Sequence, residues 1–566
     1  MYECPNCAGN LKFDIVRQQL YCEYCNTMVD PYSFYKEKDA EETVVSFTDM
    51  ETASGKKMTE YEATVFTCPQ CGGEIISEDT TAATFCSFCG SATILDSRIS
   101  RQRRPGYIIP FQKTKEDCRE AYAKMMRKAV FAPKELKDEA LIEKFRGIYM
   151  PYWVYSFEKK ENIVFPGKKS RRKGDYVITD HYQLSCEIDG EHKGLAYDAS
   201  ASFSDSLSGA IAPFDLKQRK PFVPSFLSGF YADTNDVDQY VYRWEAEDMA
   251  VNDSCRRLMR SSVCRKYQAG EGSNRNTLRN ALRPSTAKAE LAMLPVWFLS
   301  YRNGDRVSYA VVNGQTGRAA ADLPVDRKKY LFGSLLMAVP LFFLLNLFLT
   351  ITPTKILLMA ALLSLLCIFI SNVQINRILA RESGEDDKGL ASVRPAPRDS
   401  IVQRGRNPRR VRRSMGTWGK VGLIILLFYG IVLLQNVIVT TMLRRAVSGG
   451  SYRAFTSLMP ILVFLGILGI FVFVVRKNSQ GVSGKKAAGG GHFKEKFPTL
   501  AKPLGGILAA VVIWIANPVS DWFYYIGAFA CMGMVFWAIL DIIKHHNMLA
   551  TRKLPQFNRR GGDDLE

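Results

Sequence analysis

Eight of the fourteen cysteines in this 566-residue chain form two copies of one pattern. In each copy, two Cys-x2-Cys pairs are separated by fourteen residues. The two-residue spacer lets a tight turn direct both sulfur atoms at one ion, and two such turns supply the four thiolates that tetrahedral Zn²⁺ takes at about 2.3 Å. The pattern therefore predicts two Zn²⁺ ions per chain. The predicted ligands are Cys4, Cys7, Cys22 and Cys25 in the first copy and Cys68, Cys71, Cys86 and Cys89 in the second.

The cellular compartment decides how paired cysteines are used. The first metal pair follows Met1 without the basic start and apolar run of a signal peptide, so we expect this part of the chain in the cytosol. Cytosolic thiols stay reduced, which favours metal ligands over disulfides. Four thiolates also bind iron in rubredoxin-like sites, although no flavin, haem or second redox motif accompanies them. Because a closed four-cysteine site has no open position for water or substrate, we predict that the zinc ions fold the ribbons and that the protein is not an enzyme.

Each four-cysteine pattern is typical of a zinc ribbon, a small β domain. Gly72 and Gly90 follow the second cysteine of a pair, where a metal-binding turn can use positive φ. Short runs at residues 11–16 and 74–77 predict strands of a hairpin between the turns. We assign residues 1–30 to the first ribbon, 31–63 to an acidic, solvated linker and 64–97 to the second ribbon.

Residues 98–327 are predicted to form a cytosolic α+β domain. Thr114 is the expected N-cap of its first helix, with Glu116 and Asp117 in the first turn. The apolar runs 150–157 and 294–301 share a motif, since each carries a proline followed two residues later by a tryptophan. We predict that both runs are core strands of the same domain.

The rest of the chain is dominated by apolar segments. Tyr330 to Thr352 holds no charged residue, and at about 1.5 Å per helical residue it is long enough for the roughly 30 Å of bilayer hydrocarbon. The sequence thus predicts an all-α polytopic membrane domain of about six helices over residues 328–545, followed by a cytosolic tail at 546–566. The expected spans are 330–352, 356–373, 421–443, 456–475, a short fifth at 504–519, and 522–543, with basic cytosolic loops at 374–419 and 476–503.

The net positive charge of the chain comes entirely from residues 328–566. From residue 328 onward 30 Lys and Arg face 11 Asp and Glu, whereas the first 327 residues hold 45 of each sign. The positive-inside rule requires a basic excess on the cytosolic side, so we expect a multi-pass cell-membrane protein with both termini in the cytosol. A formally neutral head makes nucleic acid an unlikely partner class. The run from Arg404 to Arg413 either attracts anionic lipid or serves topology alone.

Several further motifs carry a resemblance to one family. They are Tyr107–Phe111, Gly147–Trp153, Lys220–Phe230, Leu294–Trp297 and Val312–Gly317. With the two ribbons, they resemble the bacterial membrane-anchored double zinc-ribbon proteins, whose ribbon is of the transcription-factor-B type. The resemblance implies association with phage-shock protein A-like or stomatin- and flotillin-like proteins in envelope stress. A primosomal-helicase relationship is not supported, because the chain has no G-x-x-x-x-G-K-[ST] loop for nucleotide phosphates.

Together these observations predict a membrane-embedded scaffold or anchor without enzymatic activity. Its zinc-ribbon head would recruit cytosolic or membrane proteins at the inner membrane face. One alternative is a transporter or channel-like protein with a regulatory head, although the apolar segments hold almost no ionisable group of the kind that ion pathways use. A second alternative is a membrane-tethered ribbon that binds nucleic acid. The sequence leaves both a monomer and an oligomer open.

Overall fold

The computed structural model describes residues 2–34, 44–46, 60–77, 86–91, 96–269, 274–348, 353–383, 386–393, 505–510, 512–513, 516 and 518–553. The chain divides into two compact units. The first is assembled from three separate stretches, Met1–Pro324, Arg381–Pro395 and Ala550–Glu566, and the second from Val325–Ala380 and Ala396–Leu549. The chain therefore leaves the first unit and returns to it twice.

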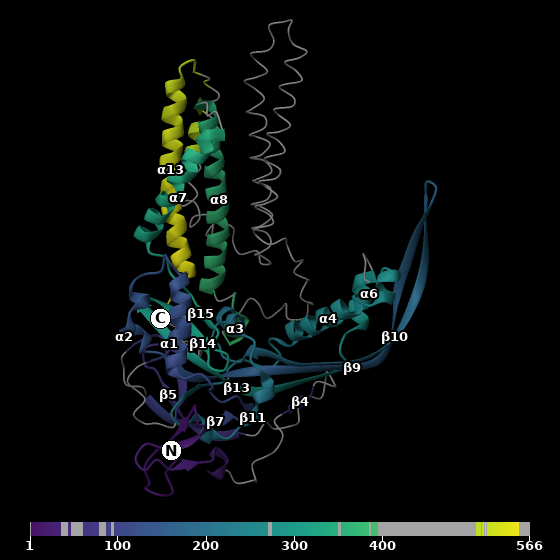
Figure 1. Cartoon of the computed structure of the whole chain (residues 1–566), viewed down its shortest axis with the longest axis vertical. Coiled ribbons are helices and arrows are strands. Elements are labelled where there is room, and N and C mark those ends of the chain that lie inside the picture. The colour runs from purple at the N-terminus through teal and green to yellow at the C-terminus, as the bar shows by residue number, and fades with distance from the viewer. Residues whose placement is uncertain are drawn as a thin grey trace, which may run out of the picture. The chain divides into compact units, whose positions relative to one another are not determined.

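The first ribbon is a small antiparallel sheet of the first unit (Figure 1). Its strands are β1 (Leu11–Asp14), β2 (Gln19–Cys22) and β3 (Met28–Val29). Along β1 and β2 buried and exposed residues alternate, as a sheet with one covered face requires. The covered face packs on the 3-10 helix η6 (Pro224–Leu227), where the rings of Phe13 and Phe226 lie 5.3 Å apart.

A 13-stranded sheet dominates the first unit and runs through the second ribbon. Its path follows the order β11-β8-β13-β9-β12-β6-β5-β7, with β10 paired to β9, β4 to β13, and β14 carrying both β15 and β16. The strands are β4 (Val44–Ser46), β5 (Glu60–Thr67), β6 (Glu74–Ser77), β7 (Asp96–Arg103), β8 (Tyr107–Ile108), β9 (Arg146–Lys173), β10 (Tyr176–Asp198), β11 (Lys220–Pro221), β12 (Tyr231–Asp233), β13 (Thr286–Asn303), β14 (Arg306–Asn313), β15 (Ala319–Ala321) and β16 (Arg552–Lys553).

Residues 44–46 and 60–63, expected in a solvated linker, thus form strands of this sheet. β6 joins the second ribbon to the rest of the sheet, because it pairs with β5 on one side and with β12 on the other. At the opposite end of the chain, β16 pairs with β14.

Helices of the first unit pack around the sheet. α1 (Lys115–Lys128) begins at the predicted N-cap, since the Thr114 hydroxyl accepts from the Asp117 N–H at 3.2 Å and the Asp117 carboxylate accepts from the Thr114 N–H at 3.0 Å. The N-cap prediction is confirmed. The other α-helices described in this unit are α2 (Glu139–Ile142), α3 (Asp205–Ile211), α4 (Arg243–Met259), α5 (Ser262–Lys266), α6 (Asn274–Ala281) and α9 (Lys388–Val393).

The two Pro-x-Trp motifs lie on the neighbouring strands β9 and β13. The two strands pair antiparallel, and Pro151 lies opposite Met293 while Pro295 lies opposite Tyr149. Residues 147–155 of β9 are buried without interruption, as a central strand covered on both faces should be. The prediction that both runs are core strands of one domain is confirmed.

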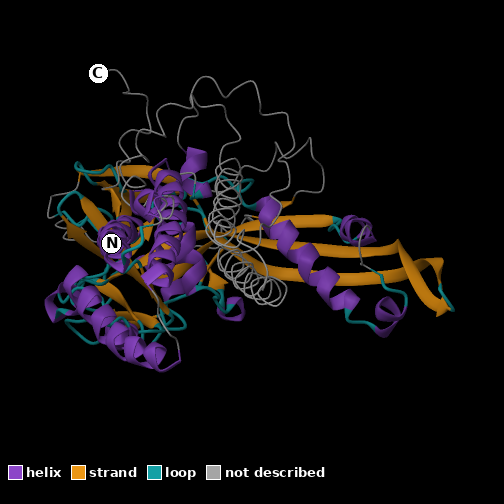
Figure 2. Ribbon diagram, turned by 90° about the horizontal axis from the view of Figure 1, so that it is seen from above, coloured by secondary structure: helices purple, strands orange, loops and turns teal. Residues whose placement is uncertain are grey.

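Beyond this core, β9 and β10 continue as a two-stranded hairpin arm, residues 159–190 (Figures 1 and 2). The pairing of β9 with β13 ends at Glu158 opposite Thr286, so among the described residues no third strand accompanies the arm. α4, α5 and α6 cover one face of its base, where Ile163 and Phe165 share a core with Leu278. Figure 2 shows these helices alongside the two strands.

The second unit is helical in its described part. It contains α7 (Arg327–Phe348), α8 (Pro353–Ser383) and α13 (Asp521–Leu549). α8 and α13 share an apolar core that includes Leu357, Ala361 and Cys531. The Asn547 side chain near the end of α13 accepts from the Val325 N–H at 2.8 Å and donates to the Val325 carbonyl at 2.9 Å, which ties the two ends of this unit together.

The predicted all-α polytopic domain of about six membrane helices is wrong. In the described part of the chain, only Ile356–Arg381 and Asp521–Leu549 are long and apolar enough to cross a membrane, and the 13-stranded sheet is the main element. These two helices overlap the expected spans 356–373 and 522–543; 421–443 and 456–475 lie outside the described residues. Hydropathy misleads here because an apolar helix can pack on other helices, and more than half of the most apolar part of Ile356–Arg381 is buried.

Candidate metal centres

The first four-cysteine group brings its sulfur atoms together at one point. The Sγ atoms of Cys4, Cys7, Cys22 and Cys25 all lie within 4.8 Å of one another. Cys4 and Cys25 are 3.4 Å apart at sulfur, as are Cys7 and Cys22. Each of these two contacts joins a sulfur atom of one metal-binding turn to a sulfur atom of the other turn. The set offers one ion four thiolates and no oxygen or nitrogen ligand, which suits Zn²⁺.

The second group repeats this arrangement with Cys68, Cys71, Cys86 and Cys89. Its cross-turn sulfur distances are 3.9 Å between Cys68 and Cys89 and 3.7 Å between Cys71 and Cys86. Both groups have the ligand set of one zinc ion each, so the prediction of two zinc ions per chain is confirmed at the level of the ligands. The chemistry that such closed sites provide is cross-linking of the chain.

All four metal-binding turns use the same backbone conformation. The residue after the second cysteine has positive φ in each, namely Ala8 at 57°, Asn26 at 58°, Gly72 at 70° and Gly90 at 70°. The sequence pointed only to the two glycines. Ala8 and Asn26 were missed because L-residues other than glycine rarely adopt this region, where asparagine is better tolerated than alanine.

A hydroxyl two residues after the last cysteine approaches the sulfur in both ribbons. Thr27 Oγ1 lies 3.0 Å from Cys25 Sγ, and Ser91 Oγ lies 3.0 Å from Cys89 Sγ. The hydrogen bond from Thr27 lowers the pKa of the Cys25 thiol to about 6, which favours the thiolate that binds metal. The sequence signal for these residues is the shared pattern Cys-x-[Ser/Thr], and sequence reasoning missed it.

The two sites differ in their surroundings. All four cysteines of the second site are buried, and the carbonyl of Phe88, between two of them, accepts from the buried hydroxyl of Tyr309 on β14 at 2.8 Å. The ring of Phe88 also packs edge-on against Phe298 of β13. The second site is therefore part of the core of the large sheet.

The first site lies at a surface. Cys7 is exposed, and Tyr24, which lies in a metal-binding turn between Cys22 and Cys25, is 79% exposed. The ribbon is attached on its other side, where the Phe13 N–H donates to the Ser228 carbonyl at 3.0 Å and the Gln18 side chain donates to the Phe111 carbonyl at 2.7 Å. The first ribbon is therefore attached to the rest of the unit on one side, and its metal-binding turns are exposed to solvent on the other.

The basic run beside the second ribbon is partly neutralised by its neighbours. Arg98 forms an ion pair with Glu74 at 2.7 Å. On the paired strands β5 and β7, Arg101 lies opposite Glu62 and Arg103 lies opposite Glu60. Opposite charges at paired positions of a sheet attract each other. The other basic segment singled out from the sequence, Arg404 to Arg413, lies outside the described residues.

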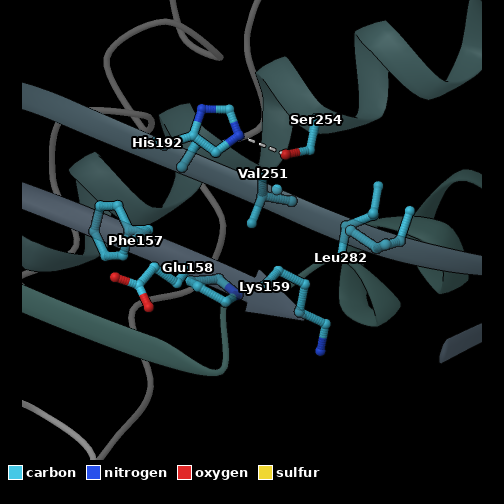
Figure 3. Close-up of a pocket in the computed structure, with 11 residues that line it drawn as sticks. Phe157, Glu158, Lys159, His192, Val251, Ser254 and Leu282 are labelled. Carbon is cyan, nitrogen blue, oxygen red and sulfur yellow. Dashed lines mark hydrogen bonds between the residues drawn. The ribbon is translucent and has the colours of Figure 1, made fainter. Parts of the chain in front are cut away.

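A small pocket beside the arm contains a histidine and a serine (Figure 3). His192 Nε2 lies 2.7 Å from Ser254 Oγ, whereas His192 Nδ1 lies 3.9 Å from the Asp253 carboxylate. Asp253 instead binds Arg257 at 2.7 Å. A distance of 3.9 Å is too long for the hydrogen bond that orients the histidine of a hydrolase triad. The His192–Ser254 contact therefore joins β10 to α4.

Comparison with known proteins gives one distant relative. The chain is 25% identical over 332 residues to the uncharacterized protein YdjG of Bacillus subtilis (strain 168), an alignment that covers 58% of this chain and 91% of the relative. No model of a known protein family matches the chain. No solved structure matches it either. The chain thus contains two four-cysteine groups and, in its described part, two candidate membrane helices, and it is similar to an uncharacterized bacterial protein.

Proposed function

We propose that this protein is a non-enzymatic membrane scaffold or anchor whose first zinc ribbon recruits protein partners at the inner membrane face. The observation that carries the proposal is the contrast between the two metal sites. The second site is enclosed in the core, where it stabilises the sheet. The first site holds Tyr24 in solvent on a rigid, metal-bound frame. Aromatic residues are enriched in protein-binding surfaces relative to the rest of a protein surface.

The assembly of the first unit supports its location on one side of a membrane. Residues 1–324, 381–395 and 550–566 belong to one compact unit, so they share a side. The basic residues that adjoin the apolar segments support a cytosolic position for the first unit and both termini.

The family resemblance suggests which partners to examine first. Phage-shock protein A-like and stomatin- or flotillin-like proteins are the proposed classes, and envelope stress is the proposed setting. The test is a chemically crosslinked pull-down of the full chain from intact membranes, quantified by mass spectrometry. In the variant Tyr24→Ser, recovery of the specific partners should fall by about tenfold or more, as expected for truncation of a central interface residue.

Ile99→Ser is a suitable control for that experiment, because Ile99 is also an exposed apolar residue but lies on β7, beside the second ribbon. Both variants should retain two zinc ions per chain. Equal recovery of every crosslinked protein by the Tyr24 variant and the control would contradict recruitment through the first ribbon.

A further inference from the structure

The tip of the hairpin arm, Lys169 to Thr179, is exposed along its whole length. The last contact with the helices beneath it lies just before the tip, where the Lys168 N–H donates to the Tyr267 carbonyl at 2.7 Å and Tyr182 packs on the Tyr267 ring. From Lys168 to the turn at Gly174 the strands rise about 3.3 Å per residue, so roughly 17–20 Å of ribbon extends beyond the helices.

The two strands of the tip differ in chemistry. β9 supplies Lys169, Arg171, Arg172 and Lys173, and β10 supplies Tyr176, Val177 and Ile178. The strand register places them side by side: Lys173 lies opposite Tyr176, Arg172 opposite Val177 and Arg171 opposite Ile178. The three outermost cross-strand pairs thus each combine a cation with an aromatic or aliphatic side chain, while Ser170 lies opposite Thr179 and Lys169 opposite Asp180.

The fold does not account for the apolar half of these pairs. Tyr176 is 78% exposed and Val177 is 68% exposed, and they lie on opposite faces of the ribbon because side chains alternate along a strand. A two-stranded ribbon with both faces in water is marginally stable alone. Exposed valine and isoleucine at its end add to that cost unless something covers them.

Three of the four cations of the tip have no carboxylate opposite them on the paired strand, whereas Lys169 lies opposite Asp180. Within the described residues, no ion pair involves Lys169, Arg171, Arg172 or Lys173, and Arg172 uses its Nε to donate to the Gly174 carbonyl at 3.1 Å. The tip contains one carboxylate, Asp175, and a second, Asp180, adjoins it. These two face the four cations. The tip therefore carries a local positive excess, whereas the charges of residues 1–327 as a whole balance.

We propose that the tip docks on an anionic lipid surface. Basic side chains attract anionic headgroups, while tyrosine and aliphatic side chains at the same level enter the interfacial region. Valine and isoleucine have no corresponding role on a nucleic-acid backbone. The proposal rests on the membrane association proposed above, since candidate membrane helices in the same chain keep the head near a bilayer.

The proposal is tested on the full chain in lipid nanodiscs. A solvatochromic amino acid replaces Val177, and its emission is compared in discs of phosphatidylcholine alone and in discs with 30% phosphatidylglycerol. Vesicles of the second composition are also added to the first kind of disc, which allows for docking on a separate bilayer. We expect a blue shift with phosphatidylglycerol in at least one arrangement, and a loss of the shift in high salt.

The variant R171Q/R172Q/K173Q should weaken the lipid response by about tenfold or more, because each basic residue near an anionic surface contributes to attraction. The matched control K124Q/R127Q/K128Q removes the same charge from exposed residues of α1 and should respond like the parent protein. Two zinc ions per chain and unchanged partner capture in the pull-down would show that the head and its recruiting surface are intact.

Three outcomes would overturn the proposal. One is the absence of a lipid-dependent shift in both arrangements. Another is an equal loss of the lipid-dependent shift in the tip variant and in the α1 control, which would show that the shift depends only on the net charge of the chain. The third is a shift with a double-stranded DNA or RNA oligonucleotide at physiological salt but not with phosphatidylglycerol, which would assign the tip to nucleic acid.

Discussion

Met150 of β9 and Leu294 of β13 lie directly opposite each other, and each immediately precedes a proline. The two Pro-x-Trp motifs therefore extend from one register point in opposite directions, which gives this part of the sheet a local two-fold relation. The tryptophans also act alike. Trp153 donates its indole N–H to the Val237 carbonyl at 2.8 Å, and Trp297 donates to the Lys113 carbonyl at 2.9 Å.

Replacing either tryptophan by phenylalanine should destabilise the first unit. The ring volume is largely kept, but a buried carbonyl loses its donor, which costs about 1–3 kcal/mol. We expect Trp153→Phe and Trp297→Phe to lower the thermal midpoint of the full chain in detergent by similar amounts. Trp244→Phe, on the exposed side of α4, should leave it nearly unchanged. A neutral result for Trp153→Phe would show that this hydrogen bond is not needed.

The two zinc sites should differ in what their loss affects. Cys86→Ser should open the second site and loosen β5, β6, β12 and β14, because that site lies in the core of the sheet. Cys22→Ser should unfold only the first ribbon. Each variant should retain one zinc ion per chain. Hydrogen exchange can separate the two cases by following residues 296–312, and equal protection there in both variants would contradict the assignment.

The hydroxyls beside the sulfur atoms should strengthen metal retention. Thr27→Val removes the hydrogen bond to Cys25, and loss of a supporting group around a metal ligand typically costs 10–100-fold in affinity. Thr27→Ser keeps the hydroxyl and serves as the control. Competition with a colorimetric zinc chelator measures the difference, which should be confined to one of the two ions. Indistinguishable chelator curves for the valine and serine variants would rule out this role.

Stability should fall with rising pH at the contact that holds α9. Burial raises the pKa of Asp387 to about 6, and the neighbouring Asp205 carboxylate adds to the rise. The folded state thus holds this proton more tightly than the unfolded chain, whose aspartate pKa is about 3.9, so stability is lost between about pH 4 and pH 6 and remains lost above.

Asp387→Asn should therefore stabilise the first unit at pH 8, by at most about 3 kcal/mol, and by about half as much at pH 5. Asparagine can still accept the hydrogen bond from the Leu390 N–H, which keeps the start of α9 intact. Asp386→Asn removes a partner of Arg381 and should not stabilise. Calorimetry of the full chain at the two pH values makes the comparison, and a larger gain at pH 5 would contradict the sign.

The shared side of the three stretches in the first unit can be checked by labelling. Single cysteines introduced at Gly304, in the β13–β14 turn, and at Ala391, in α9, should both be protected from a membrane-impermeant maleimide in intact cells. Both should react after permeabilisation, and the parent protein provides the background. Labelling of Ala391→Cys but not Gly304→Cys from outside would contradict a common side.

Short-range rules were enough to predict the metal ligands, the Thr114 cap and the two core strands. The eight cysteines and the cap act within one turn of chain, where spacing alone determines geometry. The large sheet depends instead on pairings such as Val307 with Arg552, which join residues far apart in the sequence. No local periodicity specifies such a pair.

The prediction of about six membrane helices failed for a related reason. The apolar residues of Ile356–Arg381 are explained as well by packing on α13 as by lipid, and a hydropathy window counts both equally. Cys531 shows the difference: it is fully buried between helices, where its thiol donates to the Gly506 carbonyl.

The pairing of β16 with β14 affects how the protein is made. Arg306 donates to the side chain and the carbonyl of Thr551, and β16 then covers the end of β14. During synthesis this edge of β14 stays unpaired until the ribosome has translated residue 553, which comes after all of the apolar segments. An open strand edge favours pairing with other chains, so a nascent head depends on rapid completion or on a chaperone, and nonsense mutations near the C-terminus should yield aggregation-prone protein.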